Sequence, residues 1–472
     1  MTVTYGLLIA MPLSTRPQAG ALTIVLGLSS LVTGLDFTIV YVALPDIGRD
    51  LGFSAASLQW VVSGYAIPYG GLLLLSGRLG DLLGRRLVFI GGMATFAIGS
   101  TLGGLAPNPG LLIAARVLQG IGAAALFPTT LALVHTSFGD GKTRDRALAI
   151  WAAAGAAGLS LGALGGGILT RFVGWQGVFF VNLPIVVVCL LGAARLLPAR
   201  QRPTAPVGTV DISGAATGTA GIALAIFAIG QGPALGWASA PIVLSAAVAA
   251  ILLGVFVRIE ATTADPLLPF RILRNRSFAT TTGIILLFGL TLNTIPFVLT
   301  QFFQTVLNFS ALTAGLAFLL PTAAITAGNL VGLRLNNRLG IRATLAGSIL
   351  LGALGAALLA AAMTSHSTFA TAIPGIVCFG LGLGVAYPAM FGAAAVDITD
   401  ADSGVASAIA SSALQIGSAT GLAVLAIVNS WVGAGSTRQG LRIGLFMFAL
   451  AAVLTSLAAT RLPGTRELPG PE

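Results

Sequence analysis

Two charged residues stand inside long apolar stretches of this sequence. Asp36 lies in the stretch 21–44, about eight residues or ~12 Å from its end, and Arg116 lies in the stretch 110–134, ~10 Å from its beginning. An acid or a guanidinium that deep in an apolar layer is costly unless it is paired, hydrated or, for the acid, protonated. One buried acid and one buried base at matched depth predict an ion pair.

Such a pair is suited to the chemistry of moving protons. We expect Asp36 to couple a proton or to contact a substrate, and Arg116 to tune the protonation of Asp36 or of groups near it. Two structural alternatives stand beside this hypothesis. Asp36 is then a hydrogen-bonded acid that fixes its own helix, or the two residues form a static ion pair that holds two helices together.

Aromatic and amide side chains at helical spacing are candidates for lining a cavity. Tyr65 and Tyr69 are four residues apart, and Asn293, Phe297 and Gln301 follow one another at the same step, so each set shares one helix face. Mixed aromatic and polar faces suit an amphiphilic small molecule. Ordinary packing against neighbouring helices is the alternative for both sets. The expected cavity lining is Tyr65, Tyr69, Gln119, Asn293, Phe297 and Gln301, with Asn329, Tyr387 and Gln415 as scattered further candidates.

Enzyme chemistry has little support in the sequence. A membrane-embedded enzyme usually needs clustered carboxylates, histidines or cysteines for acid–base work or metal ligation, and the apolar stretches contain no such cluster. Cys189 and Cys378 both lie inside apolar stretches, which argues against a disulfide framework and against a cysteine-based metal site. We therefore expect no catalytic residue, no cofactor and no metal.

The elements that position these residues are membrane-spanning helices. Of the 472 residues, 56% are hydrophobic and 8% are charged, and the mean hydropathy is +0.97, whereas soluble domains are roughly one quarter charged. A spanning helix needs ~20 apolar residues. The chain offers fourteen such stretches, at 21–44, 57–76, 87–106, 110–134, 147–170, 177–197, 211–231, 239–257, 279–306, 311–333, 343–363, 369–392, 404–430 and 441–460.

The basic residues predict the orientation of these helices. The formal charge of +10 comes from arginines in short loops and not from a tract that would bind nucleic acid. With both termini in the cytoplasm, the outer loops and the span ends next to them hold only Arg49, Arg171, Arg438 and Arg442. The positive-inside rule thus predicts a multi-pass protein of the inner (plasma) membrane with both termini cytoplasmic.

A weak internal repeat divides the chain into two halves. Gly340 and Arg342 match Gly84 and Arg86 in otherwise similar short segments between apolar stretches, and such repeats are typical of secondary transporters. The expected division is a cytoplasmic segment 1–20, a six-helix bundle 21–197, a linker 198–277 with two further spans and an interfacial segment, a six-helix bundle 278–461 and a cytoplasmic tail 462–472.

The segment Gly77–Arg86 is a short polar turn between two of the spans. It reads Gly-x-Leu-x-Asp-x-x-Gly-Arg-Arg, and its glycines allow a tight bend. We expect Asp81 at the start of the following helix, where it accepts the free N–H groups. The turn resembles the loop between helices 2 and 3 of the major facilitator superfamily. The gating residues that this resemblance implies are Gly77, Gly80, Asp81, Gly84, Arg85 and Arg86.

Further segments resemble the fourteen-span drug:proton antiporters of that superfamily. Leu35–Pro45 and Leu58–Tyr69 are similar to helices 1 and 2, and Arg116-x-x-Gln-Gly-x-Gly is similar to the helix 4 motif, whose arginine is associated with proton transfer. Gly174–Pro184 resembles the entry to helix 6, which we interpret as interfacial anchoring. The stretch 147–170 resembles the glycine-rich antiporter helix, with Ala163 in place of the motif's proline. Its matching residues are Gly158, Gly162, Gly165 and Gly166.

The resemblance implies an all-α polytopic membrane protein with the major facilitator fold, made of two six-helix bundles plus two inserted helices. It implies a proton-coupled antiporter that exports a hydrophobic or amphiphilic small molecule, such as a drug or antibiotic, by alternating access. Export of an endogenous metabolite and proton-coupled uptake are the alternatives, and a membrane-embedded enzyme is disfavoured. The expected partners are the small-molecule substrate, protons and the lipid bilayer, with no nucleic acid, and we expect a monomer.

Overall fold

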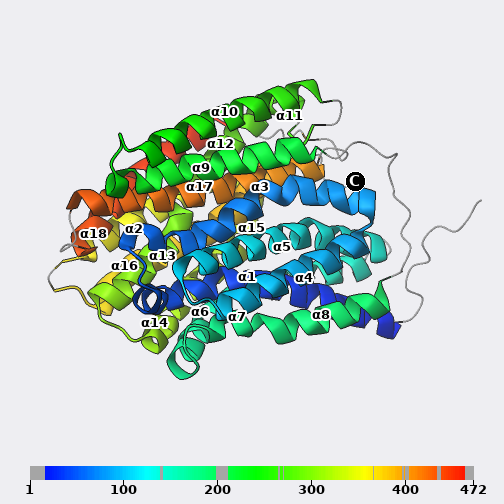
Figure 1. The fold of residues 1–472 in the computed structure, drawn as a ribbon, viewed down its shortest axis with the longest axis horizontal. Coiled ribbons are helices and arrows are strands. Elements are labelled where there is room, and N and C mark those ends of the chain that lie inside the picture. The colour runs from blue at the N-terminus through cyan, green and yellow to red at the C-terminus, as the bar shows by residue number, and fades with distance from the viewer. Residues whose placement is uncertain are drawn as a thin grey trace, which may run out of the picture.

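The computed structural model describes residues 16–138, 142–197, 211–263, 266–268, 270–364, 366–395, 398, 403–432 and 437–462. All regular secondary structure in these ranges is helical (Figure 1). Apolar segments form helices in lipid because every backbone N–H and C=O group must find a partner within the chain. Residues 198–210 of the expected linker, most of the segment 1–20 and all but residue 462 of the tail 462–472 lie outside the described residues.

The first bundle contains helices that run back and forth along the length of the molecule (Figure 1). α1 begins at the end of the molecule where α3 meets α4. We call this the Gly84 end, and the other the opposite end. The helices are α1 (Arg16–Leu51), α2 (Ala55–Leu58), α3 (Trp60–Leu83), α4 (Arg85–Gly104), α5 (Pro109–Ser137), α6 (Lys142–Phe172), α7 (Gly177–Phe180) and α8 (Asn182–Leu196).

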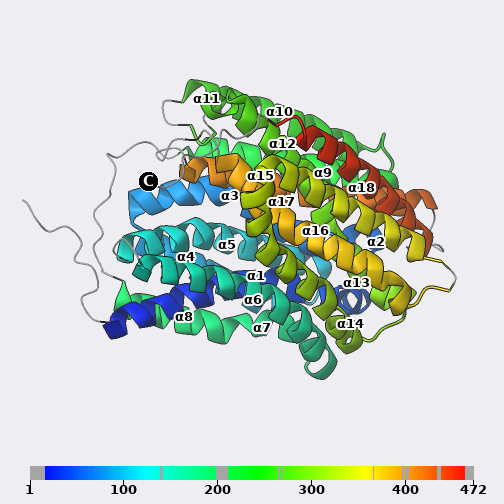
Figure 2. The ribbon, with the colours of Figure 1, turned by 180° about the vertical axis from the view of Figure 1, so that it is seen from behind.

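The second half begins after an inserted pair of helices that lies at one edge of the molecule in both views (Figures 1 and 2). The inserted pair is α9 (Ile212–Leu235) and α10 (Ala240–Thr262), followed by the single turn α11 (Phe270–Leu273). The second bundle contains α12 (Arg276–Leu290), η1 (Leu292–Thr294), α13 (Ile295–Gln301), η2 (Phe302–Val306), α14 (Ala311–Ala317), α15 (Leu319–Ala362), α16 (Phe369–Ala395), α17 (Ser403–Val432) and α18 (Thr437–Ala459).

Twelve helical segments of the described chain are long and apolar enough to cross a membrane. Of the other two expected spans, 147–170 falls within the continuous helix α6, and 57–76 consists of the end of α2 and most of α3. All fourteen expected stretches are therefore mainly helical, while the count of fourteen spans stays a prediction. The division of the chain into the five expected regions also stays a prediction.

The polar turn between α3 and α4 is shorter than expected. α3 continues to Leu83, and Gly84 alone separates it from α4, with φ +91°. Asp81 is therefore in the last turn of α3 and not at the start of α4, where it was expected; the N-cap of α4 is Gly84. Gly340 makes the same kind of break inside α15, with φ +78°. The two matched glycines thus have matching backbone conformations.

α1 is longer than the apolar stretch predicted. It ends at Leu51, because Pro45 is accommodated inside the helix and does not terminate it. Asp36 consequently lies near the middle of α1 and deeper than ~12 Å from its end. The two bundles meet where α3 packs against α17 and α6 packs against α14, and α9 contacts both α3 and α17. The inserted helix α9 therefore touches both sides of the boundary between the bundles.

Candidate functional site

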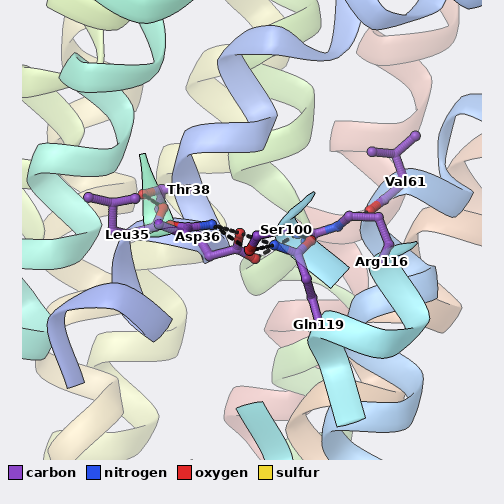
Figure 3. Close-up of polar contacts among 8 residues, drawn as sticks. Leu35, Asp36, Thr38, Val61, Ser100, Arg116 and Gln119 are labelled. Atoms are coloured by element: carbon purple, nitrogen blue, oxygen red, sulfur yellow. Dashed lines mark hydrogen bonds and ion pairs between the residues drawn. The ribbon is translucent and has the colours of Figure 1, made fainter. Parts of the chain in front are cut away.

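Arg116 and Asp36 form a buried ion pair in the first bundle (Figure 3). Nη1 of Arg116 donates to Oδ2 of Asp36 at 2.6 Å and to Oε1 of Gln119 at 2.8 Å, and Nε donates to the carbonyl of Val61 at 2.8 Å. The side chain of Arg116 is 2% exposed and that of Asp36 is 0% exposed. Charge-assisted bonds to a planar guanidinium fix both the distance and the orientation of the pair.

The second carboxylate oxygen of Asp36 accepts two further hydrogen bonds. Nε2 of Gln119 and Nδ2 of Asn182 each donate to Oδ1 at 2.9 Å. Both amide groups also donate to the hydroxyl of Ser100, at 2.9 and 3.3 Å. All of these side chains are fully buried. Asp36 is therefore held by three donors from α5 and α8, in surroundings where an unpartnered charge would be costly.

Glycines bring the helices of this cluster close together. A Cβ on Gly99 of α4 would lie 2.8 Å from the carbonyl of Ala115 and 2.8 Å from Cγ of Gln119. Because only glycine permits this approach, Ser100 on α4 comes within hydrogen-bond distance of Gln119 on α5. The polar cluster thus depends on backbone contact between helices.

The expected glycine face of α6 packs on α1. A Cβ on Gly158 or Gly162 would meet the backbone of Leu35, and one on Gly166 would lie 2.6 Å from the carbonyl of Ile39. Gly165, which also matches the antiporter motif, has no atom within 4 Å of its Cβ position. The reason is the helix period, since residues four apart share a face and Gly165 breaks the series. The face supports α1 on both sides of Asp36.

A cavity of about 320 Å³ lies between the two bundles. Three of the expected residues line it, Tyr65 and Tyr69 from the first half and Asn293 from the second, and the two tyrosine rings stack at 5.7 Å. Asn329, Tyr387 and Gln415 also line it. The described lining contains no ionised side chain, and its aromatic and amide groups suit an amphiphilic molecule.

Three expected cavity residues lie elsewhere. Gln119 is part of the polar cluster around Asp36 and is fully buried. Phe297 and Gln301 line a second cavity, of about 630 Å³, which also includes Asp46 and Asn429. The expected stripe with Asn293 is broken because the 3₁₀ turn η1 ends just after Asn293 and changes the helical register.

Tyr65 connects the central cavity to the ion pair. Its ring lies 4.5 Å from Cζ of Arg116, which is a cation–π contact, and the same residue lines the cavity. A molecule in the cavity therefore contacts a side chain that contacts Arg116.

The residues around Gly84 that were expected to gate the protein contact two neighbouring helices. Nη2 of Arg86 donates to the carbonyl of Ala194 on α8 at 3.0 Å, and Nη1 of Arg85 donates to that of Ala132 on α5 at 3.5 Å. The Cβ positions of Gly77 and Gly80 face α5. The side chain of Asp81 lies outside the described part of the structure.

Asn182 and Ser100 belong to the cluster but were not expected there. The segment Gly174–Pro184 was interpreted as interfacial anchoring, and this is wrong for Asn182, which is fully buried and donates to Asp36. A signal was present, since Asn182 is an amide at the start of a strongly apolar stretch. Among the described residues, no group of three or more His, Cys, Asp or Glu side chains is placed to hold a metal ion.

Two helical bundles around a central cavity, with a buried ion pair beside it, define the protein as a secondary transporter. The chain belongs to the Major Facilitator Superfamily, whose sequence profile matches residues 26–422 and also 278–471.

Relatives of the chain are named for resistance and export. The puromycin resistance protein pur8 of Streptomyces alboniger is 37% identical over 412 residues, which cover 85% of this chain and 80% of that protein. The cephamycin export protein CmcT of Amycolatopsis lactamdurans is 37% identical over 447 residues, 91% of each chain. The solved structure of the POT family transporter PepTSo matches with a TM-score of 0.68 at 13% identity, over 94% of this chain and 97% of that one, and so shares the fold.

Proposed function

We propose that this protein exports a hydrophobic or amphiphilic small molecule in exchange for protons. The observation that carries the proposal is the buried Asp36–Arg116 pair, joined through Tyr65 to a cavity between the bundles. The names of the relatives favour drugs or antibiotics as the class of substrate. A cavity without ionised lining suits a neutral, zwitterionic or singly cationic compound.

Transport proceeds by rocking of the two bundles about the central cavity. Contacts at the opposite end, such as the 2.6 Å hydrogen bond from Nε2 of Gln304 to the carbonyl of Val42, must break when the cavity opens there. At the Gly84 end, Asp81, Arg85 and Arg86 act as a latch whose contacts form in one state only, because only differential contacts bias such an equilibrium.

In this proposal, Asp36 carries the exchanged proton and Arg116 controls when it is released. The protein works as a monomer in the plasma membrane with both termini in the cytoplasm. Export of an endogenous metabolite uses the same geometry with another compound, and proton-coupled uptake uses it in the reverse direction.

Transport in sealed vesicles tests the proposal. Purified protein is reconstituted, a pH gradient is imposed, and accumulation of puromycin or of a lipophilic monocationic dye is measured for wild type and Asp36→Asn. We expect the gradient to drive accumulation by the wild type and not by Asp36→Asn, which retains a hydrogen-bonding side chain of the same size. Equal accumulation by the two proteins would remove Asp36 from the coupling mechanism.

A further inference from the structure

A second pair of buried carboxyl groups lies in the inserted helices, away from the site described above. Asp211 is the N-cap of α9 and is 6% exposed, and Glu260 is in the last turn of α10 and is 3% exposed. The two helices pack against each other. Asp211, at the start of α9, therefore lies beside Glu260, at the end of α10.

Each carboxylate uses one of its oxygens to bind the backbone. Oδ1 of Asp211 accepts from the N–H of Gly214 at 2.7 Å and from the hydroxyl of Ser213 at 2.8 Å. Oε2 of Glu260 accepts from the N–H of Leu268 at 2.8 Å. These bonds fix both side chains: Asp211 binds the first turn of its own helix α9, and Glu260 ties the end of α10 to the segment that leads into the second bundle.

The other two oxygens face the same point and have no partner. Oδ2 of Asp211 and Oε1 of Glu260 are buried without a hydrogen bond. Both are close to the position that a Cβ would occupy on Gly214, Oε1 at 2.8 Å from it. Glycine at this position leaves the space between the two oxygens open.

If both carboxylates are ionised, no basic side chain among the described residues hydrogen-bonds to their facing oxygens. Arg258 on α10 and Arg271 on α11 have exposed side chains, and neither donates to the two unpartnered oxygens. An uncompensated buried charge is strongly destabilising. Among the described residues, no third acid, His or Cys joins these two carboxylates.

We propose that Asp211 and Glu260 together bind one monovalent cation, either a proton or a sodium ion, between their facing oxygens. The bound cation neutralises one of the two charges and holds the inserted pair to the segment 266–268. Because α9 contacts both α3 and α17, the site lies on the element that spans the boundary between the bundles. The proposal concerns a site separate from Asp36 and does not depend on the exported compound.

The stability of the purified protein as a function of cation concentration tests this site. A cation that binds the folded state and not the unfolded state stabilises the fold as its concentration rises. The apparent unfolding temperature is measured in lipid nanodiscs from mildly acidic to alkaline pH, in choline chloride and in sodium chloride. The variants are Glu260→Gln and Asp211→Asn, each of which removes one charge, and asparagine remains a good N-cap for α9. Asp46→Asn, in the surface ion pair with Arg49, is the control.

If the cation is a proton, the apparent unfolding temperature of the wild type falls by several degrees as the pH rises in choline chloride. The unfolding temperatures of Glu260→Gln and Asp211→Asn fall much less. If the cation is sodium, sodium chloride restores the unfolding temperature of the wild type at alkaline pH and has no such effect on the two variants. Asp46→Asn should follow the wild type in either case. Parallel pH profiles for wild type and both variants, together with no sodium effect, would overturn the proposal.

Discussion

The ring of Tyr65 packs against the guanidinium of Arg116 at 4.5 Å and also lines the central cavity. This contact is the direct physical link between a bound molecule and the buried ion pair. A ligand that moves the ring changes the environment of Arg116, and through it the environment of Asp36.

Replacing Tyr65 separates the contribution of the ring from that of the hydroxyl. Tyr65→Leu removes the π face, and the lost cation–π energy of about 0.5–2 kcal/mol corresponds to a fall of about 2- to 30-fold in gradient-driven transport. Tyr65→Phe keeps the face and should retain most of the coupling. The measurement is gradient-driven accumulation of substrate in vesicles; equal accumulation by Tyr65→Leu and wild type would contradict the link.

Arg116→Lys should abolish efficient coupling. Arginine donates to Val61, Asp36 and Gln119 from one rigid fork, and a lysine ammonium cannot reach all three acceptors. Each lost charge-assisted bond is worth about 1.5–3 kcal/mol, so transport should fall about tenfold or more. Arg442→Lys on the exposed face of α18 is the matched control and should transport normally.

Asn182→Ala should weaken the fold and the site together. It removes one of the three donors to Asp36 and one of those to Ser100, at a cost of about 1–3 kcal/mol in the free energy of unfolding. Thermal unfolding in detergent measures the loss. Ser430→Ala, whose exposed hydroxyl bonds only its own helix, should leave the unfolding temperature unchanged; a similar shift in both variants would argue against a special role for Asn182.

Gly162→Ala should be far more harmful than Gly165→Ala. A methyl group on Gly162 would lie 2.5 Å from the carbonyl of Leu35, so α1 and α6 must separate beside Asp36. We expect a loss of stability of about 1–3 kcal/mol and a loss of transport. Gly165 has open space around its Cβ position, and its alanine variant should behave like the wild type.

The two glycine breaks should respond alike to substitution. Gly84→Ala and Gly340→Ala each place a side chain on a backbone with positive φ, which costs about 1–3 kcal/mol. At Gly340 the cost is conformational alone, since no atom lies within 4 Å of its Cβ position. Gly347→Ala, in the same helix with equally open space, is the control; if it lowered the unfolding temperature as much as Gly340→Ala, strain at the break would not be the cause.

The match between Gly84 and Gly340 and the pairing of Asp36 with Arg116 were both predictable from the sequence. A glycine at a tight turn favours a positive φ, and a charge in an apolar stretch requires a partner. Residue type and position are therefore enough to predict both features. The expected position of Asp81 at the start of α4 and the shared stripe of Asn293, Phe297 and Gln301 were wrong, because small changes in helix length or register redirect every side chain that follows.

By itself, the sequence determined that the chain is a bundle of membrane helices in which one buried acid, Asp36, and one buried base, Arg116, form an ion pair. Lipid leaves the backbone no alternative to the helix, and it leaves a buried charge no alternative to a partner. Only the tertiary structure decided that Ser100 and Asn182 complete the shell of Asp36, that Tyr65 joins it to the cavity, and that Asp211 faces Glu260. These neighbours come from helices far apart in the chain, and how closely those helices approach depends on glycine contacts that no local pattern records.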